Sequence, residues 1–126
     1  MPQIDIITMS EAQHQKEYVT WFRRQYPKYS RSLRLSLNGV NLPKGKTAAI
    51  MINSFKSQGM VTGESDLFIA VPKGKYSGLF IEMKKIGGRA TGEQLEYLSY
   101  MFSMGYQTAV CEGFNDAILQ TKAYLK

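Results

Sequence analysis

Apolar positions recur along this chain with two periods, one typical of amphipathic helices and one typical of strands. They predict eight elements: a helix over residues 11–25, a strand over 33–37, a helix over 47–58, strands over 66–71 and 78–84, a helix over 92–104, a strand over 106–112, and a last helix that begins at Asn115 or Asp116. This order indicates an α/β fold in which one mixed central sheet is flanked by helices. No linker or repeat divides the chain, so we expect a single domain over residues 1–126.

Polar and helix-breaking residues mark the ends of the predicted helices. Ser10 with Gln13, and Thr91 with Gln94, have the spacing of capping boxes. The first three helices should end at Pro27, Gly59 and Gly105. The stripes expected to face the core are Ala12, Tyr18, Val19, Phe22 and Tyr26 in the first helix, Ala48, Met51, Ile52 and Phe55 in the second, Leu95, Leu98, Met101 and Phe102 in the third, and Ala117, Ile118, Thr121 and Leu125 in the last.

Charged residues interrupt the two neighbouring apolar strands at 66–71 and 78–84. Asp66 opens the first strand, and Glu82 and Lys84 close the second. Burial of an unpaired charge costs several kcal/mol, so these groups need partners. A loop over residues 72–77 predicts antiparallel pairs whose numbers sum to about 149, with Asp66 opposite Met83. Because side chains alternate between faces, a shift that pairs Asp66 with Glu82 or Lys84 would put all three charged groups on one face.

Directly opposed residues have Cβ atoms about 5 Å apart, and two carboxylates on such residues repel each other unless a cation lies between them. Mg²⁺ suits this position, because it takes hard oxygen ligands and leaves room for water and a substrate phosphate. The backbone carbonyl of Met83 would be a further ligand, and Lys84 would orient the attacking water or stabilise negative charge. The pattern therefore predicts metal-assisted phosphodiester hydrolysis. In the alternative interpretation, Asp66 caps a strand end and Glu82 pairs with Lys84 at a sheet edge.

Composition excludes several other classes of site. Cys111 is the single cysteine and His14 the single histidine, so no intrachain disulfide and no cysteine- or histidine-rich zinc site is possible. We expect Cys111 in the core and His14 on the surface, opposite Glu11. No apolar run is long enough to span a membrane, and the N-terminus lacks the pattern of a signal peptide. The net charge of +6 favours a polyanionic partner such as nucleic acid.

The spacing of Asp66, fifteen residues and then Glu82-Met83-Lys84 resembles the motif of PD-(D/E)xK nucleases. The wider pattern resembles one branch of them, the VRR-NUC domain (virus-type replication-repair nuclease). The segments that carry this resemblance are Ser10–Gln15, Asn38-Gly39, Gly59 to Gly63, Asp66–Phe68, Gly78–Lys84, Gly88-Arg89, Glu93-Gln94 and Gly105-Tyr106. One position departs from the family, whose members often have proline where this chain has Ser65.

The resemblance implies a restriction-endonuclease-like core and a nuclease that uses Mg²⁺ or Mn²⁺. Its site residues would be Asp66 and Glu82 as metal ligands, Lys84 as the catalytic lysine, Glu11 as the acid of the first helix, and Gln94 as a support of the site or a contact to the DNA backbone. Glu17 is the alternative to Glu11 for a direct or water-mediated metal contact. The family also implies a homodimer that cuts branched DNA such as flaps or four-way junctions. The single cysteine and the lack of a signal-peptide pattern favour a reducing, intracellular setting, so we expect the protein in the cytoplasm, or in the host cell cytoplasm if it is viral.

Basic side chains in the predicted loops would hold the DNA backbone around this site. They are Arg34, Lys44, Lys46, Lys73, Lys75, Lys85 and Arg89. Two other functions fit the composition: a non-catalytic DNA-binding module on a nuclease scaffold, and a small dimeric interaction protein. Neither explains why Asp66, Glu82 and Lys84 are all present, because a scaffold without catalysis gains nothing from buried charge.

Overall fold

The order of elements in the computed structural model is the one that the sequence predicts, with two short 3-10 helices added. The structure describes residues 5–36, 45–61 and 63–126. Its elements are a 3-10 helix at Ile6–Thr8, α1 (Glu11–Gln25), a 3-10 helix at Pro27–Ser32, β1 (Leu33–Leu35), α2 (Lys46–Ser57), β2 (Leu67–Ile69), β3 (Leu79–Lys84), α3 (Gly92–Ser103), β4 (Gln107–Glu112) and α4 (Phe114–Leu125). None of the helices described is long and apolar enough to cross a membrane.

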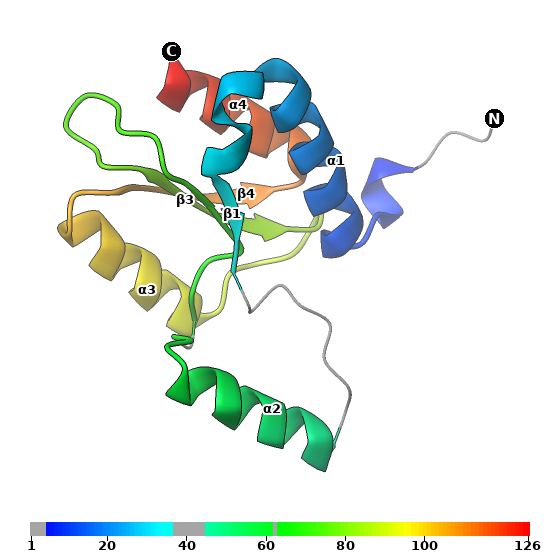
Figure 1. Cartoon of the computed structure of the whole chain (residues 1–126). Helices are drawn as coiled ribbons and strands as arrows, with labels where there is room; N and C mark the ends of the chain where they lie inside the picture. Colours follow the sequence, from blue (N-terminus) through cyan, green and yellow to red (C-terminus); the bar gives the residue numbers. More distant parts are fainter. Residues whose placement is uncertain (1–4, 37–44, 62) are drawn as a thin grey trace.

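The four strands form one mixed sheet in the order β1-β2-β3-β4. β2 pairs antiparallel with both β1 and β3, and β3 pairs parallel with β4. Helices α1 and α4 cover one face of the sheet, α3 lies against the other, and α2 stands apart from these layers (Figure 1). The predicted α/β architecture is therefore confirmed, and β3 occupies an interior position in which all six of its residues are buried.

Helix α1 begins at the predicted capping box, where the Ser10 hydroxyl accepts the Gln13 N–H and the Gln13 side chain accepts the Ser10 N–H. It buries His14, Tyr18 and Phe22, three positions spaced four residues apart. Ala12 was expected on this stripe but is exposed, because a residue two positions from His14 points away from the same face. The expected surface position of His14 is also wrong, because His14 lies four residues before Tyr18 and therefore on the buried face of the helix.

The main core lies between the sheet and the pair α1 and α4. It contains Tyr18 and Phe22 of α1, alternate residues of β2 and β3, Cys111 of β4, and Ala117 and Leu125 of α4. The Tyr18 hydroxyl and the Thr121 hydroxyl form a buried hydrogen bond of 2.6 Å. Cys111 is fully buried, as the sequence predicts.

The opposite face of the sheet carries a second, aromatic cluster under α3. Phe68 of β2 stacks on Phe80 of β3 with ring centroids 4.3 Å apart, and Tyr97 of α3 meets Phe80 edge-on. Helix α3 buries Leu98. Leu95 and Phe102, which were expected in its core stripe, are 51% and 49% exposed, because α3 turns the side that contains Tyr97 and Leu98 toward the sheet.

Two predicted elements contribute little to the core. Helix α2 has its expected stripe on one side, but every residue of that stripe is only half-buried and α2 buries no residue fully. In β1, Leu35 is 55% exposed, so the expected half-buried strand is covered less than its pattern indicates. The expected turn at Asn38-Gly39, the end of the predicted strand at Leu37 and Lys44 lie outside the described residues.

Candidate active site

The β2–β3 hairpin brings the three charged strand residues together. Leu67 pairs with Ile81, so partner numbers sum to 148 and the same register continued by one residue sets Asp66 opposite Glu82. The predicted pairing of Asp66 with Met83 is therefore wrong by one position. The observed register is one of the two that place all three charged side chains on one face of the sheet.

Two hydrogen bonds between backbone and carboxylate fix the positions of the acids. Asp66 Oδ2 accepts the Met83 N–H at 2.9 Å, and Glu82 Oε2 accepts the Asp66 N–H at 3.2 Å. Lys84 Nζ lies 3.4 Å from Glu82 Oε1. Because Glu82 is 1% and Lys84 7% exposed, this ion pair lies inside the protein, and loss of either partner would leave a buried charge.

Burial changes the proton affinity of both carboxylates. It raises the pKa of Glu82 to about 7, with the nearby charge of Asp66 raising it further, while Lys84 opposes the shift. Burial also raises the pKa of Asp66, against the opposing effects of the Met83 N–H and the Lys84 ammonium. A single lysine therefore does not neutralise the two acids, and the site favours an additional positive charge.

Glu11, the acid predicted in the first helix, contacts the site at Lys84. Glu11 lies at the first turn of α1, and its Oε1 is 3.9 Å from Lys84 Nζ. Its side chain is 46% exposed, so it borders the site from the solvent side. Glu17 is exposed and lies six residues further along α1, about 9 Å of helix rise. The structure thus brings Glu11, and not Glu17, to the candidate site.

The oxygen donors at the hairpin suit a hard divalent cation that has room for other ligands. Among the described residues, no three His, Cys, Asp or Glu side chains gather closely enough to hold a metal ion. The donor set is therefore the pair Asp66 and Glu82, which matches the one or two carboxylates that Mg²⁺ usually takes from protein. Glu11 contacts Lys84 instead of completing a cluster of three acids.

The Met83 carbonyl faces the same edge as the two carboxylates. The N–H and C=O of one strand residue point to the same side, and the Met83 N–H points to Asp66. The next carbonyl, that of Lys84, points the other way and accepts the Gly113 N–H at 2.7 Å. Among the described residues the β2–β3 ladder ends at the pair of Leu67 with Ile81, so the Met83 carbonyl lies beyond it, beside the carboxylates, where a cation could use it.

Gln94 has a structural contact that is separate from the carboxylates. Gln94 Oε1 accepts the Thr91 backbone N–H at 2.8 Å, and the Gln94 backbone N–H donates to the Thr91 hydroxyl. These two bonds form the predicted capping box of α3. This confirms the cap. The expected contact of Gln94 with the site or with DNA stays a prediction.

The basic residues divide into those near the site and those far from it. Arg34 of β1 lies by a groove that also contains Ser65, next to Asp66. Lys85 and Arg89 are exposed in the turn that follows β3, a turn held by a hydrogen bond from the Gly87 N–H to Glu112 Oε1. Lys46 begins α2.

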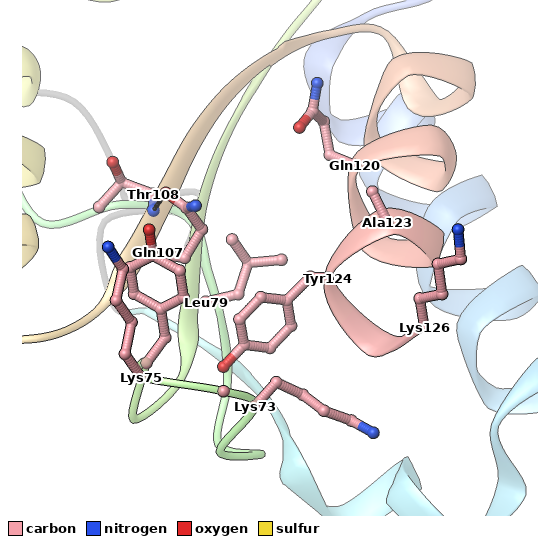
Figure 2. A pocket seen from close by; sticks show the side chains of 11 residues that line it. Lys73, Lys75, Leu79, Gln107, Thr108, Gln120, Ala123, Tyr124 and Lys126 are labelled. Atoms are coloured by element: carbon pink, nitrogen blue, oxygen red, sulfur yellow. Dashed lines mark hydrogen bonds between the residues drawn. The ribbon is translucent and has the colours of Figure 1, made fainter.

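Lys73 and Lys75 were expected around the site, but the structure places them at the hairpin tip. The site lies at the other end of β3, where Glu82 and Lys84 are three and five residues, or about 10 and 17 Å, along the strand from Leu79. The two lysines instead line a 440 Å³ pocket together with Tyr124 and Lys126 of the C-terminal segment (Figure 2). Their predicted position beside the carboxylates is therefore wrong, and their predicted contact with DNA stays a prediction.

His14 and Gly113 support the site from the α1 side, and the sequence did not reveal this role. His14 Nδ1 accepts the Phe114 N–H at 3.1 Å, which ties α1 to the start of α4. Gly113 has φ +87°, and its N–H bonds the Lys84 carbonyl. Glycine is favoured there because few L side chains adopt this φ, and an added Cβ would also displace Ile86 Cδ1, which it would meet at 2.8 Å. The four-residue spacing from His14 to Tyr18 was the available signal for burial of the histidine.

Comparisons with known proteins identify the family of this chain. The model of the VRR-NUC domain family matches residues 7–115. A solved structure named "VRR_NUC domain protein" is similar to this chain with a TM-score of 0.77 at 28% identity, over 93% of this chain and 88% of that one. No significant match exists among curated proteins. VRR-NUC domains are generally nucleases, and since the family model spans most of the sequence, this chain belongs to the VRR-NUC domain family and carries a nuclease-type domain.

Proposed function

We propose that the protein is an Mg²⁺- or Mn²⁺-dependent DNA endonuclease that hydrolyses phosphodiester bonds in branched or flapped DNA. One observation carries this proposal. Asp66, Glu82 and Lys84 converge on one sheet face, and each carboxylate is held by a backbone N–H of the hairpin. Two buried acids with raised pKa values cost stability unless a cation offsets them, which supports binding of a divalent metal at this position.

Each residue would have a distinct role in hydrolysis. Asp66, Glu82 and the Met83 carbonyl would hold the metal ion, which when bound polarises a phosphoryl oxygen and lowers the pKa of water. The Lys84 ammonium, 3.4 Å from Glu82, would orient the attacking water or stabilise the negative charge that develops on the phosphate. Glu11 would keep Lys84 in place from the solvent side and could receive a water-mediated metal contact.

The net charge of +6 supports DNA as the partner, and Arg34, Lys85 and Arg89 lie where they could contact its backbone. Branched substrates and a homodimer follow from the resemblance to the family. The half-exposed apolar stripe of α2 is consistent with a second copy, because that helix buries none of its residues fully against its own chain. Light scattering during size-exclusion chromatography measures whether the protein is a dimer.

A cleavage panel tests the proposal. Purified protein is incubated with a flap, a four-way junction, a linear duplex and supercoiled DNA, each with Mg²⁺, with Mn²⁺ or with EDTA. We expect metal-dependent cleavage that prefers the branched substrates and is lost in Lys84→Ala. The matched control is Lys122→Ala, which removes an exposed lysine of α4 and should leave cleavage unchanged.

Two results would contradict the proposal in different ways. Absence of cleavage on every substrate with either metal would refute nuclease activity. Salt-dependent DNA binding that persists in Asp66→Ala, Glu82→Ala and Lys84→Ala, with no cleavage by any form, would favour a non-catalytic DNA-binding module.

A further inference from the structure

A groove next to the carboxylates is partly lined by aromatic rings. Its lining includes the rings of Phe68, Phe80 and Tyr97 and the polar side chains of Arg34, Glu64 and Ser65, around a volume of 350 Å³. These six residues are called the aromatic groove here. Ser65 directly precedes Asp66, so the groove begins beside the candidate active site.

The alternation of the two strands connects the groove to the acids. Asp66 and Phe68 share one face of β2, and Glu82 and Phe80 share the same face of β3. In each strand the ring is therefore two residues, about 7 Å, from the carboxylate. A phosphate bound at the carboxylates would have the base of a neighbouring nucleotide within reach of the rings.

Ser65 gives an independent indication that the groove accepts a polar ligand. It is 2% exposed, and its hydroxyl has no hydrogen-bond partner among the described residues. Buried hydroxyls nearly always have a partner, because loss of water without a replacement is costly. The groove thus combines aromatic rings with an unsatisfied hydroxyl, one guanidinium and one carboxylate. Rings can stack on a nucleobase, the hydroxyl and the carboxylate can bond its polar edge, and the guanidinium can contact its phosphate.

We propose that the aromatic groove binds an unpaired nucleobase adjacent to the scissile phosphate. This inference rests on the proposed nuclease function and narrows its substrate class. A base inside a duplex is stacked on both faces and paired at its edge, so it cannot enter a side groove without leaving the helix. The enzyme would therefore select DNA that offers an unpaired nucleotide beside the cleaved bond, as flaps and junctions do.

The test is a binding experiment in EDTA, so that cleavage does not interfere. Flap duplexes carry 2-aminopurine, in turn, at each of the three nucleotides on either side of the branch, and matched duplexes carry an abasic site there. At one position the wild-type protein should quench 2-aminopurine fluorescence and bind the abasic duplex about tenfold more weakly, since one base–aromatic stack contributes a factor of this order. Tyr97→Leu should abolish both effects, whereas Tyr97→Phe, which keeps the ring, should retain them.

A second variant guards against misfolding of Tyr97→Leu. Ser65→Ala removes only the unpartnered hydroxyl, and it should reduce the preference for the base-containing duplex without loss of folded structure. Equal binding of base-containing and abasic duplexes at every position, together with normal cleavage, would overturn the groove proposal and leave the nuclease standing. Base-dependent binding without cleavage by any form would refute the nuclease and leave the groove as a base-binding site alone. Absence of both base-dependent binding and cleavage would overturn both proposals.

Discussion

The substitution Glu82→Gln should reveal how much the buried charge of the site costs the protein. Glu82 is 1% exposed and has a pKa of about 7, against an ordinary value of 4.5. Glutamine has nearly the same shape, and its amide oxygen can still accept the Asp66 N–H. The substitution therefore removes a titrating charge and preserves the packing of the interior strand β3.

The sign of the effect follows from the raised pKa. Between pH 4.5 and about 7 the folded protein holds a proton on Glu82 that the unfolded chain releases, so the free energy of unfolding falls as pH rises. The stabilisation is complete below pH 4.5 and is lost above about pH 7. That interval corresponds to about 3 kcal/mol for a single site. Glutamine does not titrate, so the variant does not lose this stability. The free energy of unfolding of Glu82→Gln, relative to that of the wild type, should therefore rise by about 3 kcal/mol between pH 4.5 and pH 8.

The assay is urea unfolding in EDTA, followed by circular dichroism at several pH values from 4.5 to 8. The difference in free energy of unfolding between variant and wild type is compared at each pH, because the titration of groups that do not interact with Glu82 then cancels. Glu96→Gln, which changes an exposed glutamate of α3, is the matched control and should show no trend. A difference for Glu82→Gln that stays constant, or that moves toward the wild type as pH rises, would refute the electrostatic description of the site.

Three further predictions concern other parts of the structure. In calorimetry, excess Mn²⁺ without DNA should raise the melting temperature of the wild type but not of Asp66→Asn, since a ligand at 100 times its Kd adds about 2.7 kcal/mol. Gly113→Ala should lower the free energy of unfolding in urea by about 1–3 kcal/mol, because φ is +87° and the new Cβ would meet Ile86 at 2.8 Å. Thr121→Val should cost about 1–3 kcal/mol in the same assay, because the Tyr18 hydroxyl, its 2.6 Å partner, would remain buried and unpaired.

Local signals predicted much of the fold because their causes lie within a few residues. The capping boxes at Ser10 and Thr91 each need one partner three positions away, and both form as predicted. Gly59 and Gly105 end their helices with φ of +112° and +97°, as residues without a side chain can. The helix order and the mixed sheet follow from such signals together with the hydrophobic period.

Features that depend on distant parts of the chain could not be predicted. The burial of His14 requires α4, 100 residues away, to present the Phe114 N–H. Lys73 and Lys75 looked close to the site in sequence, yet β3 separates them from it in space. Ser65 belongs to a groove shared by β1, β3 and α3, which no single segment of the sequence describes.

The hairpin tip explains why the predicted register was wrong by one residue, and why the site forms. The backbone N–H of each of Lys73 and Tyr76 donates to the carbonyl of the other, which closes a turn around Gly74 and Lys75. The residue numbers of this pair sum to 149. From that turn to the pair formed by Ile69 with Leu79, the first arm has the three residues 70–72, and the second arm has only the two residues 77–78. The extra residue of the first arm shifts the strands to a sum of 148.

That single extra residue decides on which side of the sheet Asp66 lies. Pro72 lies in the longer arm and has no N–H for a ladder, so a regular continuation of the turn is disfavoured there. In a regular hairpin from the same turn, Asp66 would oppose Met83 and share its face, which packs into the core under α1 and α4. The carboxylates of Asp66 and Glu82 would then lie on opposite faces. The irregular tip, whose Tyr76 lies six residues or about 20 Å along the chain from Glu82, is therefore what places both carboxylates and Lys84 in one site.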